Sequence, residues 1–205
     1  MTRDRRDNEI IRDLLVRIDE TDRINQRRLS QELGIALGLT NAYVKRCVKK
    51  GLIKISQVPA RRYRYYLTPK GFAEKSRLTA QYFSSSLFFF REARNQFTEL
   101  LDLCQTRRWH RVALYGNSEL SEIASLCAIG LPLVISGIVD HDGRSGHVAG
   151  HRLVPVLETL GEIDAVIITD LNDPQGAFDA LMVTVPSERI LAPRLLNISR
   201  EPKAT

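Results

Sequence analysis

Apolar residues recur every three or four positions in two neighbouring stretches near the start of the chain, a spacing that predicts two short helices. Gly34 ends the first helix at a position where a residue with a Cβ would be strained, so the turn between the helices is tight. The apolar anchors of the first helix and the turn are Leu29, Leu33, Ile35 and Leu37. Those of the second helix are Leu39, Ala42, Tyr43, Cys47 and Val48. The pattern predicts a helix-turn-helix.

The second helix leaves a polar and cationic face toward solvent. Its outward positions are Thr40, Asn41, Lys45, Arg46 and Lys49. Such a face suits a helix that enters the major groove of DNA. On periodicity alone, the alternative is an ordinary helical hairpin with a solvated basic face.

A predicted β-hairpin after these helices favours the first interpretation. Gly51 stops the helix, an apolar strand follows, and residues 63–67 form a second strand beyond a cationic tip. The arginines of this hairpin are Arg61, Arg62 and Arg64. A helix-turn-helix with a basic hairpin is a winged helix. Asn25 is suited to cap the helix that carries Arg27 and Arg28, and we expect these two arginines to position a DNA phosphate.

Three segments of this half resemble MarR-type winged-helix regulators: residues 29–35 (LSQELGI), 48–53 (VKKGLI) and 67–75 (LTPKGFAEK). Residues 73–79 (AEKSRLT) also fit the branch associated with bacterial exopolysaccharide gene clusters. The resemblance covers roughly residues 5–105. It implies a dimeric, DNA-binding transcriptional regulator of polysaccharide genes.

A long helix is predicted from Thr68 and Pro69 to about Arg108. Its apolar seam, with one charged exception, consists of Phe83, Leu87, Phe90, Arg94, Phe97, Leu101 and Cys104. A second apolar stripe covers a neighbouring face, so the helix needs two partners. We expect a homodimer interface through Phe83, Leu87, Phe90 and Phe97; the alternative is a helix buried between two domains of one chain.

Beyond this helix, short and wholly apolar strands alternate with helical stripes, which predicts a parallel sheet covered on both faces. The fold class is therefore α/β with two domains. We expect a winged helix-turn-helix domain at 1–68, a linker and dimerisation helix at 69–108, and a Rossmann-like domain at 109–205.

The turn after the first strand of that domain is a degraded form of the glycine-rich phosphate loop, Gly116-x-Ser118-x-x-Ser121. We expect Gly116, Asn117, Ser118 and Ser121 to bind a phosphate and Asp140, which ends the second strand, to bind a ribose diol. The alternative is a plain strand-to-helix turn, which also favours small residues. Residues 150–170 resemble nucleotide- or CoA-binding domains of redox-sensing repressors and polysaccharide-biosynthesis enzymes. That resemblance implies a nucleotide, nucleotide sugar, CoA ester or NAD-type ligand.

Charge separates the two halves of the chain. Residues 1–108 carry 23 Lys and Arg against 12 Asp and Glu, whereas residues 109–205 carry 7 against 12. A basic half is expected to meet DNA, and an acidic half is not. The three cysteines form no zinc or disulfide pattern, and no apolar run reaches the length of a membrane span, so we expect a cytoplasmic protein.

Histidines and acidic residues share the glycine-rich loop around residues 140–151, but their spacing matches no metal signature, and we expect a mobile polar loop without a metal. No catalytic set is recognisable. The sequence therefore predicts a non-enzymatic DNA-binding regulator whose second domain senses a phosphate-bearing metabolite. The alternatives are a nucleotide-sugar enzyme with a DNA-binding appendage and a regulator whose Rossmann-like domain is empty and serves assembly.

Overall fold

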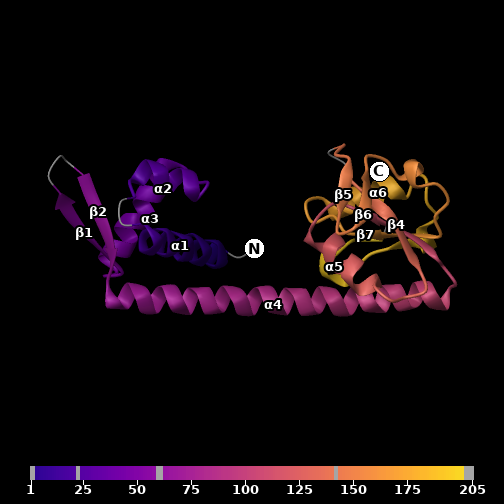
Figure 1. Cartoon of the computed structure of the whole chain (residues 1–205), viewed down its shortest axis with the longest axis horizontal. Coiled ribbons are helices and arrows are strands. Elements are labelled where there is room, and N and C mark those ends of the chain that lie inside the picture. The colour runs from indigo at the N-terminus through magenta and orange to yellow at the C-terminus, as the bar shows by residue number, and fades with distance from the viewer. Residues whose placement is uncertain (1–2, 22–23, 59–61, 141–142, 201–205) are drawn as a thin grey trace. The chain divides into compact units, whose positions relative to one another are not determined.

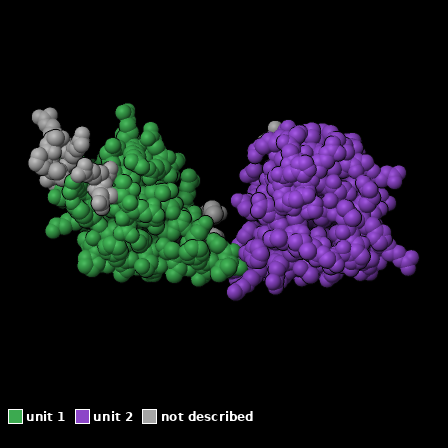
Figure 2. Space-filling view, viewed as in Figure 1, with its two compact units in different colours: residues 1–87 green, residues 88–205 purple. Residues whose placement is uncertain are grey.

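The structure is a computed structural model that describes residues 3–21, 24–58, 62–140 and 143–200. The chain forms two compact units, residues 1–87 and residues 88–205 (Figure 2). The predicted fold class is confirmed: a winged helix-turn-helix comes first, a long helix follows, and a mostly parallel six-stranded sheet with helices completes the chain.

The first unit begins with three helices, α1 (Arg3–Glu20), α2 (Gln26–Glu32) and α3 (Leu37–Lys49) (Figure 1). The antiparallel strands β1 (Ile53–Val58) and β2 (Arg62–Leu67) form the wing, with Ile53 opposite Leu67. Gly34 has a φ of +61°, as the tight turn between α2 and α3 requires. All five elements contribute to one apolar core, which includes Leu14, Leu29 and Cys47.

Helix α4 (Pro69–Thr106) starts where the sequence predicts. The Thr68 hydroxyl accepts a hydrogen bond from the backbone N–H of Gly71 at 3.0 Å, and a Cβ on Gly71 would lie 2.1 Å from the carbonyl oxygen of Leu52. The first turns of α4 therefore pack closely on the chain that leaves α3. Leu78, two turns further on, is buried in the core of the first unit.

The C-terminal part of α4 belongs to the core of the second unit. Ala93, Phe97, Leu101 and Cys104 are all fully buried there. The expectation that Phe97 lies in a dimer interface is therefore wrong, because this side chain is already covered by its own chain. Phe83, Leu87 and Phe90 are exposed by 59%, 53% and 39%. The division between the two compact units falls within α4, between residues 87 and 88.

The sheet of the second unit has the strand order β5-β6-β4-β3-β7-β8. Its strands are β3 (Arg111–Tyr115), β4 (Val134–Val139), β5 (Gly146–Val148), β6 (His151–Val154), β7 (Ala165–Ile168) and β8 (Ile190–Leu191). Every pair is parallel except β5–β6. Because the chain builds outward from β3 on one side and then returns to its other side, the sheet is doubly wound with its switch point at β3 and β7.

Alternate residues of the strands face opposite layers. Val112 and Leu114 face a layer made by α4 and by α5 (Glu119–Ala128), whereas Ala113 faces α6 (Pro174–Leu181) and the 3₁₀ turn η1 (Leu157–Leu160). Two further 3₁₀ turns, η2 (Ser187–Arg189) and η3 (Arg194–Leu196), flank β8. The sequence predicts a mobile loop up to His151, but residues 146–154 instead form the β5–β6 hairpin.

Candidate functional site

The outward face of α3 differs in phase from the predicted one. Lys45, Arg46 and Lys49 are exposed and Asn41 is half-buried, as a groove-reading helix allows. Thr40 is fully buried, and its hydroxyl donates to the carbonyl oxygen of Ala36 at 3.2 Å. The prediction that Thr40 reads DNA is therefore wrong, because this residue forms part of the stripe that packs on the core.

Two residues expected in the core take the place of Thr40 on the outside. Leu39 is 45% exposed, and Ala42, three residues later on the same side of the helix, is also exposed. With Lys45 they form a continuous outward row at a spacing of three. The N-terminal half of α3 thus offers apolar contacts, which can meet thymine methyl groups in a major groove, and the C-terminal half offers cations.

Arg46 has a partner within the protein. Its Nη1 lies 2.9 Å from Oδ2 of Asp7 on α1, while the Tyr43 hydroxyl donates to the other oxygen of the same carboxylate at 2.5 Å. The pKa of Tyr43 is raised, first by burial and then by this hydrogen bond. Asp7 thereby joins α1 to α3 and offsets the charge of Arg46, so Lys45 and Lys49 carry more of the unbalanced positive charge of the helix.

The other predicted DNA-binding arginines lie on α2 and the wing. The Asn25 side chain accepts from the backbone N–H of Arg28 at 2.8 Å, so the predicted N-cap is confirmed. Arg27 is exposed, and Arg28 forms an ion pair with Glu32 at 2.7 Å. On the wing, the half-buried Arg64 lies opposite Ser56 in the β1–β2 pairing; Arg62 begins β2, and Arg61 lies outside the described residues.

The second candidate site lies at the carboxyl ends of β3 and β4. The structure brings Asn117 and Asp140 together: the amide Nδ2 of Asn117 donates to Oδ2 of Asp140 at 3.1 Å. Asp140 is only 5% exposed, and Nε of Arg144 lies 3.6 Å from the same oxygen. The predicted cofactor-binding residues are therefore neighbours at one edge of the sheet.

The serines of this turn are occupied by the fold. The Ser118 hydroxyl donates to the carbonyl oxygen of Thr169 and accepts from the backbone N–H of Leu120 at 3.1 Å. The fully buried Ser121 hydroxyl donates to the carbonyl oxygen of Ser118 at 2.7 Å and completes a capping box at the start of α5. These hydroxyls stabilise the strand-to-helix turn, and a bound phosphate would have to replace bonds that they already make.

Position 116 requires glycine because the backbone just after β7 approaches it closely. Its φ is +117°, and a Cβ there would lie 2.4 Å from the backbone nitrogen of Asp170, just after β7. The buried Thr169 hydroxyl donates to the carbonyl oxygen of Gly116 at 2.6 Å. The sequence interpretation missed Thr169 and Asp170, although a polar pair directly after the apolar run of β7 is the signal that marks a strand's carboxyl end.

The electrostatics of this edge are acidic. The Asp170 carboxylate accepts from the backbone N–H groups of Asn172 and Asp173, at 2.7 and 3.0 Å. Glu119 and Glu122 occupy the first turn of α5, where the helix dipole favours negative charge. A phosphate near this turn would therefore be repelled by carboxylates, whereas the hydroxyl groups of a sugar would find acceptors.

The remaining candidates for chemistry are metal ligands and cysteine thiols. Within the described ranges, no group of three His, Cys, Asp or Glu side chains is placed to hold a metal ion, and His141 and Asp142 lie outside those ranges. Burial raises the pKa of the Cys47 and Cys104 thiols to about 11. Both behave as core residues and not as reactive thiols.

Residues 7–54, from α1 to the start of β1, match a family model described as winged helix-turn-helix DNA-binding. The first unit therefore carries a winged helix-turn-helix DNA-binding domain, and the chain has the features of a DNA-binding regulator. No curated protein matches the chain. No described helix combines the length and the apolar character that crossing a membrane requires.

Proposed function

We propose that this protein is a cytoplasmic transcriptional regulator that binds double-stranded DNA as a homodimer and catalyses no reaction itself. The observation that carries the proposal is the outward row of α3, in which Leu39 and Ala42 lie beside Lys45 within a winged helix-turn-helix. A dimer presents two such helices to a palindromic site. The net positive charge of the N-terminal half supports binding to a polyanion.

The test is a binding measurement on an operator selected from random duplexes, at several salt concentrations. Replacing Lys45 by Ala should weaken binding. If Lys45 contacts a phosphate, the dependence of log K on log salt concentration should become shallower by about 1. If Lys45 contacts a base, the variant should lose base preference worth about 1–3 kcal/mol. Arg77→Ala is the matched control, because Arg77 is an exposed arginine of the same unit that pairs with Glu74 on α4. Equal effects of the two substitutions would refute the assignment of the α3 face.

We further propose that the second unit senses a phosphate-bearing metabolite such as a nucleotide, a nucleotide sugar, a CoA ester or an NAD-type dinucleotide. The resemblance to MarR-type regulators of the exopolysaccharide branch makes polysaccharide genes the expected target. Support for a ligand comes from Asn117 and Asp140, which meet at the carboxyl ends of β3 and β4, the edge of a doubly wound sheet at which ligands of such folds bind. In this proposal Asp140 holds sugar hydroxyls, and the phosphate lies away from the carboxylates of α5.

A thermal-shift screen of these four compound classes tests the sensor proposal. A compound that stabilises the wild type should lose most of its effect with Asp140→Asn, and Glu162→Gln serves as a control because Glu162 is exposed on the loop before β7. Gly116 is unsuitable for substitution in this test, because any side chain there meets the backbone of Asp170. If no compound stabilises the wild type, the alternative of a unit that serves assembly gains support, and turnover of a nucleotide sugar would favour the enzyme alternative.

A further inference from the structure

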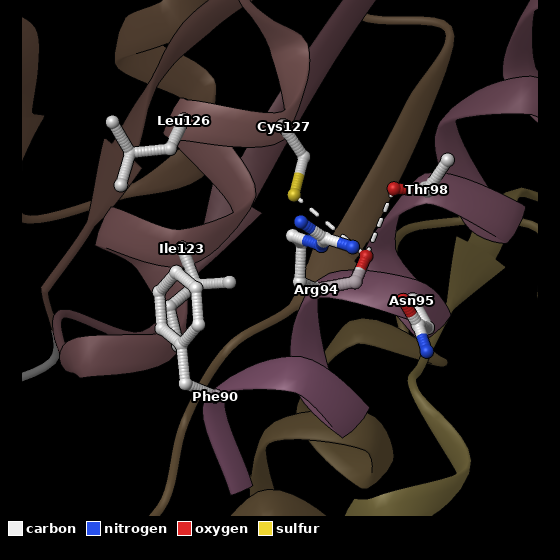
Figure 3. Close-up of a pocket in the computed structure, with 7 residues that line it drawn as sticks. All are labelled: Phe90, Arg94, Asn95, Thr98, Ile123, Leu126 and Cys127. Carbon is white, nitrogen blue, oxygen red and sulfur yellow. Dashed lines mark hydrogen bonds between the residues drawn. The ribbon is translucent and has the colours of Figure 1, made fainter. Parts of the chain in front are cut away.

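A groove of about 450 Å³ runs between α4 and α5 on the second unit (Figure 3). Its walls are formed by Phe90 and Arg94 of α4 and by Ile123, Leu126 and Cys127 of α5. Figure 3 shows the Phe90 ring beside Ile123, with Arg94 further along α4 near the sulfur of Cys127. The groove lies on the outside of the helical layer, on the side of the sheet opposite α6.

The groove is preformed by the packing beneath it. Phe97 and Leu120, one from each helix, are fully buried in the same core cluster. The backbone carbonyl of Arg94 accepts from the Thr98 hydroxyl at 2.9 Å and from the Cys127 thiol at 3.7 Å. Because the two helices are joined in this way, the groove does not need a ligand to hold it open.

Apolar surface along the groove faces water. Leu126 is 57% exposed, Ile129 at the end of α5 is 75% exposed, and Phe90 is 39% exposed. Exposed apolar side chains gathered on one face usually mark an interface with another protein. A small ligand in the groove would remain partly in water, since Phe90, Arg94 and Leu126 of its walls are exposed, whereas small-molecule pockets bury most of their ligand.

Charges lie at opposite ends of this apolar surface. Glu119 and Glu122 occupy the N-terminal end of α5 and share the outward stripe of Leu126 and Ile129, at spacings of three and four residues. Arg94 lies toward the C-terminal end, beside Cys127. Within the described part of the chain, neither Arg94 nor Glu122 forms an ion pair. A copy turned by a twofold axis across the groove would bring each arginine to the carboxylates of the other copy.

We propose that the α4–α5 face of the second unit is the interface of the homodimer, occupied by the same face of a second copy. Leu126 and Phe90 of each copy fill the groove of the other, and Arg94 of each copy pairs with Glu122 of the other at the rim. Such self-complementarity of shape and charge is what an isologous twofold contact requires. The inference rests on the homodimer of the proposed function and assigns its interface.

A charge-reversal experiment on the full chain tests this geometry by sedimentation velocity and native mass spectrometry in the absence of DNA. Arg94→Glu and Glu122→Arg should each raise the dimer dissociation constant about tenfold or more, because each creates two like-charge contacts. The double variant should recover most of the wild-type association. An equimolar mixture of the two single variants should form heterodimers, because both contacts across the axis then join opposite charges.

Two further variants complete the test. Leu126→Asp should give monomers, and unchanged fluorescence of Trp109, which packs against the core of the same unit, would show that the unit remains folded. Arg152→Glu, an equal charge change at an exposed position on β6, should leave association unchanged. Any of four results would overturn the proposal: the wild type is monomeric, the single variants associate normally, the mixture fails to associate, or native spectra show a small molecule bound at the groove. Because no DNA is present, failure here is distinct from failure of DNA binding.

Discussion

Phe97 and Phe90 lie two turns apart on α4, and the same substitution at the two positions should have different consequences. Phe97 is fully buried among the side chains that join α4 to the sheet, whereas Phe90 is 39% exposed. Phe97→Ala removes a large buried ring and leaves a cavity, which typically costs about 3–5 kcal/mol. Phe90→Ala leaves no enclosed cavity, so we expect it to cost the second unit less than about 1 kcal/mol.

Trp109 makes this comparison specific to the second unit. It is the one tryptophan of the chain, it follows α4 directly, and it packs against the core cluster that contains Phe97. Its fluorescence should therefore follow the unfolding of that unit in urea. With a dependence on urea of about 1–3 kcal/mol per molar, a loss of about 3–5 kcal/mol lowers the midpoint by about 1 M or more.

Phe90→Ala should leave the urea midpoint of the monomer nearly unchanged and should act on self-association. The two variants must be compared at a protein concentration low enough for monomers, because dimerisation itself shifts the midpoint. If Phe97→Ala unfolds at the same urea concentration as the wild type, or if both variants shift equally, the assignment of α4 to the core of the second unit fails.

Three further predictions concern α3, the β3–α5 turn and the entry to β3. Replacing thymine by uracil in a selected operator should weaken binding by the wild type more than binding by Leu39→Ala, since the variant has already lost the contact of Leu39 with a methyl group. Equal losses in a duplex-binding assay would contradict this role of Leu39. Gly116→Ala should destabilise the second unit by more than the cost of roughly 1–2 kcal/mol expected for Gly34→Ala in the first, because only Gly116 meets backbone atoms; denaturant midpoints of each unit decide this. The pKa of Asp164 is lowered chiefly by the hydrogen bond from the backbone N–H of Arg111. Asp164 should therefore stabilise the fold fully at pH values above the ordinary aspartate pKa of about 3.9, and progressively less as the pH falls below it. The difference in melting temperature between wild type and Asp164→Asn should accordingly shrink between neutral pH and about pH 3.

The fold was predictable because its elements carry strong patterns. The strand Ala165–Ile168 is wholly buried and reads as an unbroken apolar run, and Thr68 with Pro69 marks the start of α4 unambiguously. The β5–β6 hairpin escaped prediction because Gly146, His147 and Arg152 are exposed and polar, so their strand pairing leaves no alternating pattern. Backbone pairing with β6 and the packing of Val148 against the core hold β5 at the edge of the sheet.

The candidate sites were less predictable, for two physical reasons. A helical stripe can be rotated by one residue without losing its period, and Thr40 can be buried because its hydroxyl bonds to the backbone one turn earlier. The same rotation of the stripe by one residue leaves Leu39 exposed. The role of Gly116 depends on Asp170, more than fifty residues later, and no local spacing reveals that contact.

Helix α4 supplies side chains to two separate cores, and this determines where the chain can be divided. A cut after residue 108 would deprive the sheet of Phe97, Leu101 and Cys104 and uncover part of the face that α4 covers together with α5. A cut before Pro69 would take Leu78 away from the winged helix. Only a division near residues 87 and 88 leaves each core its own length of helix. The two units can therefore be expressed as separate proteins only if each of them keeps its own part of this one continuous helix.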